Sequence, residues 1–253
     1  MIKQYKISVP KSTLNEIYKK VRNFPWSAAQ NMNGWEYGTN LNYLKNISKY
    51  WITKYNWKKF ENKINSFKNY KTKVEDINLH FIFEKSKNPN SRPLLLLHGW
   101  PGSITEFLDI IPRLAHPEKY GGKIEDGFDV IVPSLPGFGF SSQIKKALGP
   151  RKIGKILNKF MVKNLGYKNY YVQGGDWGAT IAGWIGLDSS KNCKGIHINC
   201  LPLRHPKGPK NSKEKKWEKK FNFDQIMQEG YRTQQASKPQ TLSFAMIDSP
   251  VGT

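Results

Sequence analysis

Apolar residues recur at helical spacing in the first part of the chain. One predicted helix face carries Leu41, Leu44, Ile47, Tyr50 and Trp51, and the next carries Trp57, Phe60, Ile64 and Phe67. Lysines fill the outer positions, an interleaving that single-stranded nucleic-acid platforms also show. A period of 3.6 residues is typical of side chains that face a core. Residues 1–85 are therefore predicted as a mostly helical region with these aromatic side chains inside.

The period changes to that of strands after Lys71. Alternating apolar residues follow, with Glu75-Asp76 as a turn between them; they are Val74, Ile77, Leu79, Phe81 and Phe83. The helical N-terminal region is therefore predicted to lead into strand structure before residue 86.

Apolar runs alternate with helical patterns from residue 86 to residue 201. The runs at 94–97, 129–132, 170–173 and 196–198 are predicted as strands. The helix after the first run opens with a capping box of Ser103 and Glu106, and the helix at 151–165 is closed by Gly166. Strands that alternate with helices predict the α/β class, with a mostly parallel sheet covered by helices on both faces.

Residues 202–253 have a different character. Lysines are dense over 204–220, where Pro206 and Pro209 interrupt the chain, and a helix is predicted over 213–229. The segment Asp248-Ser249-Pro250 has the pattern of a helix start. We interpret residues 202–253 as a partial lid that is inserted above the sheet.

Composition excludes several classes of protein. The 253 residues are 38% hydrophobic and 13% aromatic, which is enough apolar material for a substantial core. The longest aliphatic run is Leu94–Leu97, whereas a membrane-spanning helix needs ~20 apolar residues. With two cysteines the chain cannot build a disulfide framework, which favours a reducing compartment, so we predict a cytoplasmic location.

The formal net charge of +22 could indicate a nucleic-acid or membrane partner. Lysine supplies most of this charge, because arginine occurs only at positions 22, 92, 113, 151, 204 and 232. Arginine is the preferred ligand for phosphate and guanine, and the lysines are spread along the whole chain. No nucleic-acid partner is predicted on this basis.

The candidate chemistry begins in a loop after a predicted strand. Gly174-Gly175-Asp176-Trp177-Gly178 joins that strand to a helix and has the form of a nucleophile elbow, with glycines where the backbone must pass closely. A carboxylate at the position of Asp176 would open an epoxide or an alkyl halide by forming an ester, which water then cleaves. The alternative role of Asp176 is to cap the helix.

A second loop follows the upstream strand. It is His98-Gly99-Trp100-Pro101, and it stands where an oxyanion site is completed in proteins with such an elbow. The backbone N–H groups of Trp100 and Trp177 would then point at the same developing oxyanion. We interpret His98 as a packing residue of this loop and assign it no proton transfer.

Several segments in register resemble the microsomal-type epoxide hydrolases and their bacterial relatives. They include Gly-Trp-Glu-Tyr-Gly at 34–38, the two loops above, PSLPGFGFS at 133–141 and Glu-Gly-Tyr at 229–231. Shorter matches lie at 43–44, 50–51, 57–58, 81–82, 238–239 and 248–252. The resemblance therefore covers nearly the whole chain.

The resemblance implies an α/β-hydrolase core behind an epoxide-hydrolase-type N-terminal region. It implies hydrolysis of a small apolar epoxide to a vicinal diol, without a cofactor, in epoxide catabolism and detoxification. Asp176 matches the family's nucleophile, and Tyr231 matches one of two lid tyrosines that protonate the epoxide oxygen. Ordinary lid packing is the other interpretation of Tyr231. A homodimer is left open.

The family places its catalytic histidine, its acid and its second lid tyrosine downstream of the lid. The histidines of this chain are at positions 80, 98, 116, 197 and 205, and none matches that place. We therefore expect a C-terminally truncated relative, either a fragment, a short reading frame or a degenerate copy. Such a chain would lack the last strands and helices of the core and the base for ester hydrolysis.

Two other functions fit parts of the sequence. A haloalkane dehalogenase also uses an aspartate nucleophile, but the N-terminal region and Tyr231 argue against it. A non-catalytic, basic binding protein on the hydrolase fold is favoured by the missing histidine and opposed by the intact elbow. No metal site is predicted, because on a strand Cys200 would face away from Cys193 and His197.

Overall fold

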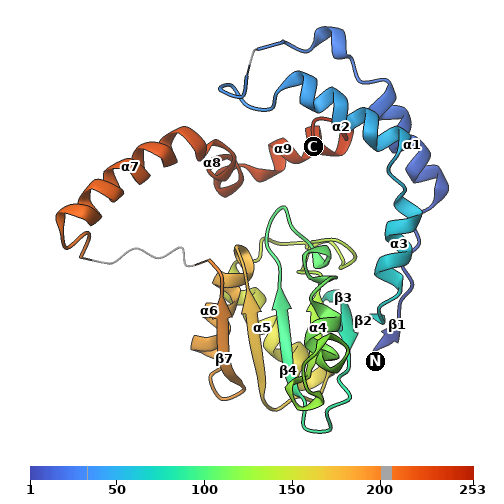
Figure 1. Ribbon diagram of the computed structural model, residues 1–253, viewed down its shortest axis with the longest axis vertical. Helices are drawn as coiled ribbons and strands as arrows, with labels where there is room; N and C mark the ends of the chain where they lie inside the picture. Colours follow the sequence, from blue (N-terminus) through green and yellow to red (C-terminus); the bar gives the residue numbers. More distant parts are fainter. Residues whose placement is uncertain (33, 201–206) are drawn as a thin grey trace. The chain divides into compact units, whose positions relative to one another are not determined.

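The structure is a computed structural model that describes residues 1–32, 34–200 and 207–253 (Figure 1). Its contacts divide these residues into two compact units, the first made of 1–7 and 58–200 and the second of 8–57 and 207–253. The predicted N-terminal region 1–85 is thus shared between the two units. The predicted boundary at 201/202 lies outside the described residues.

The first unit is built on a seven-stranded sheet in the order β1-β2-β3-β5-β4-β6-β7. Its strands are β1 (Lys3–Gln4), β2 (Asn69–Val74), β3 (Ile77–Glu84), β4 (Arg92–Leu97), β5 (Phe128–Pro133), β6 (Tyr170–Gly174) and β7 (Cys193–Ile198). The neighbours β5, β4, β6 and β7 are parallel, whereas β1, β2 and β3 are antiparallel to their neighbours. The predicted α/β class is confirmed, with the antiparallel strands along one side of a mixed sheet.

Helices and single turns connect the strands and form the second unit. They are α1 (Lys11–Arg22), η1 (Trp26–Ala28), α2 (Leu41–Thr53), α3 (Trp57–Asn65), η2 (Ile104–Phe107), α4 (Ile111–Ala115), η3 (Pro117–Tyr120), η4 (Ile124–Asp126), α5 (Pro150–Lys159), η5 (Phe160–Asn164), α6 (Trp177–Asp188), α7 (Ser212–Gln228), α8 (Gly230–Ser237) and α9 (Pro239–Asp248). Among the described helices, none combines the length and the apolar character that a bilayer crossing requires.

Alternation along the strands separates two apolar cores. Leu95 and Leu97 of β4 point into the core under α5 and α6, while Leu96 points into the core under α4. In the same way Ile131 of β5 belongs to the first core and Val130 to the second. Figure 1 shows α4 and the pair α5 and α6 packed against the sheet, so parallel strands in the centre are apolar on both faces.

Two helices differ from their predicted form. The capping box of Ser103 and Glu106 is present, but it opens only the short η2, and α4 begins separately at Ile111 because Pro112 has no N–H to continue the ladder. The predicted helix 151–165 is α-helical to Lys159 and then widens to a π-helix in η5. Gly166 follows with φ +79°, as expected of a C-terminal cap.

The helical faces at the N-terminus are only partly in a core. Ile64 of α3 is buried, and Phe60 and Phe67 pack against the core under α4, which confirms the second predicted face. The prediction was wrong for the first face, because Ile47 and Tyr50 of α2 are 46% and 53% exposed. The spacing of apolar residues correctly places these side chains on one side of a helix. It does not show whether another element packs against that side.

In the second unit, α1 packs against α2, and α8 packs against α7 and α9. The segment Asp248-Ser249-Pro250 was predicted as a helix start, and α9 ends at its first residue. After that end, the Ser249 hydroxyl accepts from the Gly252 N–H at 2.9 Å, and the Thr253 N–H donates to the Ser249 carbonyl at 2.9 Å. The segment therefore ends α9 and is followed by one turn that the Ser249 hydroxyl caps, so it is not the helix start that the sequence predicted.

A buried histidine joins three parts of the first unit. His80 on β3 contacts the Ser134 hydroxyl through Nδ1 at 2.9 Å and the Asn69 Oδ1 through Nε2 at 3.0 Å. Because the Asn69 amide group donates to the carbonyls of Ile64 and Phe67, its Oδ1 must accept, so Nε2 of His80 carries a proton. Burial, with the nearby charge of Lys71, lowers the pKa of His80 to about 3.

Acidification should destabilise the fold through His80. Below pH 6.5 the unfolded chain binds a proton at this position and the folded chain does not, so stability is lost as pH falls from 6.5 towards 3. We expect a loss of about 2 kcal/mol in the free energy of unfolding between pH 6.5 and pH 5 from this residue. Urea unfolding of the wild type and of His80→Gln measures it.

The exposed His197 provides the matched control. His197→Gln should keep the pH dependence of the wild type, whereas His80→Gln should lose about 2 kcal/mol of it. Equal slopes in the wild type and in His80→Gln would contradict the neutral, buried state of His80.

Candidate active site

The elbow predicted at residues 174–178 is present between β6 and α6. Gly174 is the last residue of β6, Gly175 turns the chain, and Trp177 is the first residue of α6. Between them Asp176 has φ +48° and ψ −124°, a backbone conformation that non-glycine residues avoid and that functional sites often hold. The strain presents the exposed Asp176 side chain at the carboxyl end of the sheet.

Parallel pairing of β4 and β6 brings the two predicted loops together. Leu97 at the end of β4 is the register partner of Gly174, and the Gly175 N–H donates to the Leu97 carbonyl at 3.3 Å. The chain after β4 therefore enters the loop His98–Pro101 beside the elbow. Its Trp100–Pro101 peptide bond is cis.

Glycine is required at two points of close approach. A Cβ on Gly178 would lie 2.1 Å from the Leu97 carbonyl oxygen, and a Cβ on Gly99 would lie 2.1 Å from Asp176 Oδ1. Side chains at these positions would push α6 away from β4 or push the carboxylate out of its place. The two glycines thus allow the contact that defines the site.

That contact is a hydrogen bond between the loops. The Trp100 N–H donates to Asp176 Oδ1 at 2.9 Å. The Asp176 side chain makes no capping hydrogen bond to α6, which was its alternative role. One carboxylate oxygen is thus held by a backbone donor of the other loop, while Oδ2 has no hydrogen bond among the described residues.

Trp177 supplies a second donor position at the same turn. As the first residue of α6 it has a backbone N–H that the helix ladder does not use. Trp177 is 49% exposed. We assign it a role through its backbone N–H and none through its side chain. Pro101, the last residue of the upstream loop, follows directly after Trp100.

His98 uses both ring nitrogens inside the loop structure. Its Nδ1 lies 2.9 Å from the Gly99 carbonyl, and its Nε2 accepts from the Leu135 N–H at 3.1 Å. Donation from Nδ1 and acceptance at Nε2 describe a neutral ring, and burial lowers its pKa, opposed by the bond to Gly99. His98 thus joins the loop after β4 to the loop after β5.

The segment 133–141, for which the sequence predicted no role, packs against the two buried histidines near the site. Phe138 packs edge-on against His98 with 5.4 Å between ring centroids, and Phe140 packs against His80 at 5.2 Å. The Ser141 hydroxyl donates to the Ser134 carbonyl at 2.7 Å and closes the loop. The signal for this function was the dense Pro-Gly-Phe pattern directly after a buried strand.

Asn199 is a second residue that sequence reasoning missed. Its N–H donates to the Gly174 carbonyl at 3.3 Å, and its side-chain oxygen occupies the space beside Gly175. A polar residue directly after β7, at the carboxyl end of a parallel strand, was the signal that could have found it.

The predicted proton donor lies in the second unit. Tyr231 is the second residue of α8 and is 61% exposed, whereas Asp176 belongs to the first unit. The role of Tyr231 stays a prediction from the resemblance.

None of the histidines at positions 80, 98, 116 and 197, which the structure describes, forms a hydrogen bond with Asp176. His205 lies outside the described residues. Over the described ranges no group of three or more histidine, cysteine or acidic side chains is arranged to hold a metal ion. Cys193 is buried and Cys200 is exposed, both as free thiols.

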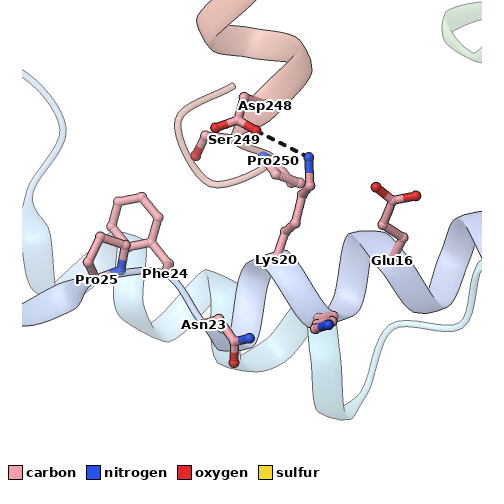
Figure 2. Close-up of a pocket in the computed structure, with 9 residues that line it drawn as sticks. Glu16, Lys20, Asn23, Phe24, Pro25, Asp248, Ser249 and Pro250 are labelled. Carbon is pink, nitrogen blue, oxygen red and sulfur yellow. Dashed lines mark hydrogen bonds and ion pairs between the residues drawn. The ribbon is translucent and has the colours of Figure 1, made fainter.

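Asp176 is not among the residues that line two hollows in the described part of the chain. One of about 380 Å³ lies in the second unit between α1 and the turn after α9, where Lys20 pairs with Asp248 at 3.3 Å (Figure 2). The other, about 730 Å³, lies on the first unit against β4, β6 and β7 and is lined mostly by apolar side chains, among them Leu96, Phe107 and the 45% exposed Ile196. It is a stretch of sheet face with little cover, and its polar lining residues include Glu106, Gln173 and His197.

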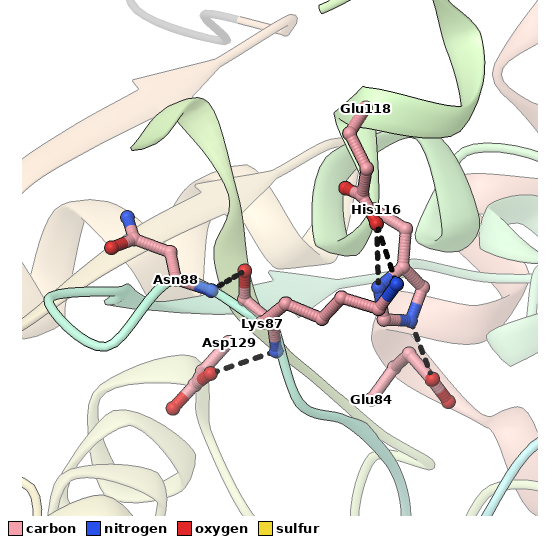
Figure 3. A network of polar contacts seen from close by, with 7 residues as sticks. Glu84, Lys87, Asn88, His116, Glu118 and Asp129 are labelled. Carbon is pink, nitrogen blue, oxygen red and sulfur yellow. Dashed lines mark hydrogen bonds and ion pairs between the residues drawn. The ribbon is translucent and has the colours of Figure 1, made fainter. Parts of the chain in front are cut away.

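A cluster of charged side chains lies at the opposite end of the sheet from Asp176. His116 Nε2 contacts Glu84 at 2.9 Å, its Nδ1 is 4.0 Å from Glu118, and Lys87 reaches Glu118 at 3.5 Å (Figure 3). Glu84 pairs in register with Val130, near the start of β5, whereas Asp176 follows the end of β6. Ligands bind open α/β sheets at the carboxyl ends of parallel strands, so this cluster is a structural network.

A sheet with a strained elbow after β6 and a donor loop after β4 defines the α/β-hydrolase class. The family model for the alpha/beta hydrolase fold matches residues 92–245, and the model for the epoxide hydrolase N terminus matches residues 2–107. The chain belongs to the α/β-hydrolase family, and its N-terminal part is similar to the N terminus of epoxide hydrolases.

Individual proteins show the same similarity. The chain is 34% identical to Epoxide hydrolase 1 of Oryctolagus cuniculus, over 99% of this chain and 60% of that protein. The structure of Aspergillus niger epoxide hydrolase matches with a TM-score of 0.87 and 26% identity, over 100% of this chain and 67% of that one. Juvenile hormone epoxide hydrolase of Bombyx mori matches with a TM-score of 0.88 and 29% identity, over 100% and 63%. The chain thus spans about 60% of the length of the curated relative.

The close approach at Gly178 predicts a large effect of one methyl group. Gly178→Ala should lower the free energy of unfolding by about 2–3 kcal/mol, because its Cβ would overlap the Leu97 carbonyl. Gly183→Ala, in the same helix with open space around it, should stabilise by about 0.5–1 kcal/mol. Chemical unfolding of both variants measures the difference, and a stable Gly178→Ala would show that β4 and α6 are not in this contact.

Proposed function

We propose that this chain carries the ester-forming site of an epoxide hydrolase, with Asp176 as the nucleophile. The observation that carries the proposal is the hydrogen bond from the Trp100 N–H to Asp176 Oδ1. The Asp176 side chain accepts this bond and does not cap α6. Similarity to epoxide hydrolases supports the choice of an epoxide as the electrophile.

In the first step, Asp176 Oδ2 attacks an epoxide carbon. The carbon–oxygen bond of the ring breaks, its electron pair stays on the epoxide oxygen, and a proton donor converts that oxygen to a hydroxyl group. The carboxylate becomes an ester in which Oδ1 is the carbonyl oxygen. Trp100 already holds Oδ1, so the ester forms with its carbonyl in contact with a backbone donor.

In the second step, water attacks the carbonyl carbon of that ester. Negative charge then develops on Oδ1, where the Trp100 N–H and the unused N–H of Trp177 would stabilise it. Collapse of the intermediate re-forms the carbonyl at Oδ1 and breaks the bond between the carbonyl carbon and Oδ2. Oδ2 takes up a proton and leaves as a hydroxyl oxygen of the diol, while Asp176 returns to a carboxylate that carries the water oxygen in its place. A base must take the proton of the attacking water.

The described residues support these steps unequally. Nucleophile, strained turn and oxyanion donor are assembled on the first unit, whereas no described histidine bonds to Asp176. Ester formation is therefore the step we assign to the 253-residue chain. Tyr231 is proposed as the proton donor, since a neutral phenol protonates an alkoxide at pH 7 and the residue matches the family's lid tyrosine.

The proposed substrate is a small apolar epoxide, and the proposed role is epoxide detoxification. We also propose a cytoplasmic location, for which the two free thiols give the support. Dimer formation stays open, and sedimentation of the purified chain would decide it.

Asp176→Asn should abolish covalent capture of an epoxide. Incubation of the wild-type chain with styrene oxide should add one equivalent of the epoxide mass at Asp176, with at most one equivalent of diol released. Fresh Asp176→Asn protein should show at least about 10²-fold slower modification, because the amide is a poor nucleophile. Intact-protein and peptide mass spectrometry follow both, with deamidation of the variant monitored.

Asp109→Asn is the matched control, because Asp109 is an exposed carboxylate on the same unit. It should be modified at the wild-type rate. Modification spread over exposed carboxylates, or unchanged labelling of fresh Asp176→Asn, would remove Asp176 from the role. Diol beyond one equivalent would keep Asp176 but show that another residue activates water, and labelling by 1-chlorobutane but not by styrene oxide would indicate a dehalogenase.

Tyr231→Phe should slow ester formation by about 10²-fold, the usual contribution of one general acid. Phenylalanine keeps the ring, so packing of α8 is preserved and only the proton is removed. Tyr50→Phe removes a hydroxyl of similar exposure in the same unit and should leave the rate unchanged. Equal pre-steady-state rates for Tyr231→Phe and the wild type would leave Tyr231 as a packing residue.

A further inference from the structure

The helix α7 carries its lysines on one side. At 100° per residue, Lys213, Lys215, Lys216, Lys219 and Lys220 fall within an arc of about 160°. All five side chains are exposed, and over the described ranges none of them forms an ion pair. We call this side of α7 the lysine face.

Acidic and paired aromatic residues lie outside the lysine face. Glu214 and Glu218 are on the other side of the helix. Trp217 and Phe221 also lie there and stack on each other, with ring centroids 4.8 Å apart. The third acidic residue, Asp224, lies just beyond the edge of the lysine arc, four positions after Lys220. The lysines are thus gathered on one side of α7, while apolar residues occur on both sides.

Two large apolar side chains stand among the lysines. Phe223 and Ile226 fall within the same arc and are 67% and 80% exposed. An exposed pair of this size within a strongly positive surface is unfavourable in water alone. Clusters of about four to eight lysines are typical of segments that anionic lipid headgroups bind electrostatically, and two exposed apolar side chains among them can enter the headgroup region.

We propose that the lysine face of α7 binds the surface of an anionic lipid bilayer. Each lysine near such a surface contributes a favourable electrostatic term that acts within a Debye length, and Phe223 and Ile226 add burial of apolar area. Because only two apolar side chains lie in the face, binding is mainly electrostatic, reversible and sensitive to salt.

The composition of the face favours lipid over nucleic acid. It contains lysine and no arginine, which is the residue that forms paired contacts with phosphate and guanine. Phe223 is the one aromatic ring in the lysine face, whereas the stacked pair Trp217 and Phe221, which could form a platform for successive bases, lies outside it.

Vesicle sedimentation tests the proposal on the full chain. Vesicles of phosphatidylcholine with about 30% phosphatidylserine should bind the protein in low salt, and vesicles of phosphatidylcholine alone should bind at least about tenfold more weakly. Raising the salt to about 1 M, where the Debye length is about 3 Å, should release the protein.

Two sets of four substitutions separate the face from the total charge. Lys215→Glu, Lys216→Glu, Lys219→Glu and Lys220→Glu together should weaken binding at least tenfold, and glutamate keeps helix propensity. The control is Lys145→Glu, Lys146→Glu, Lys163→Glu and Lys168→Glu, which gives the same net charge from exposed lysines of the first unit. It should bind within about threefold of the wild type, and circular dichroism checks that both variants fold.

Phe223→Gln with Ile226→Gln distinguishes the two classes of partner. It should weaken vesicle binding several-fold and leave any binding to single-stranded RNA unchanged. Equal losses in the two lysine variants, equal binding to neutral vesicles, or lysine-dependent binding of RNA without binding of anionic vesicles would each overturn the proposal.

Discussion

The parallel pairing of β4 with β6 is the constraint on which the rest of the site depends. Its register sets Leu97 beside Gly174, so the chains that leave the two strands must share one small space at the end of the sheet. Glycine at positions 99 and 178 lets the backbones approach closely enough for the Trp100 N–H to reach Asp176. The strained backbone of Asp176 is held by these neighbours, since an isolated turn would relax from it.

Two buried, neutral histidines stabilise the loops around this junction. His98 connects the loop after β4 to Leu135, and His80 connects β3 to Ser134, so the segment after β5 is held from both sides. Both rings have lowered pKa values because burial disfavours their charged form. The two histidines fix the loops next to Asp176. Their ring nitrogens are occupied by hydrogen bonds within these loops, so we assign them no proton transfer.

The strong positive charge is distributed separately from the candidate chemistry. The groups around Asp176 are backbone amides and glycines, whereas five exposed lysines are collected on one side of α7. A neutral, apolar epoxide gains nothing from a positive field at a distance, so the lysines of α7 are not explained by the proposed chemistry. Sorting of lysines from glutamates around α7 is the feature that distinguishes a binding face from a general solvated surface.

The sequence by itself determined the α/β class, the strands, the elbow and the loop opposite to it, because strand period, helix caps and glycine positions are local signals. It also indicated that His98 is a packing residue. Only the tertiary structure decided that Asp176 accepts from Trp100 instead of capping α6, because the partner lies 76 positions away and is set by strand register. The exposure of Ile47 and Tyr50 likewise could not be predicted from the spacing of apolar residues. That spacing shows which side chains share a helix face but not what covers the face.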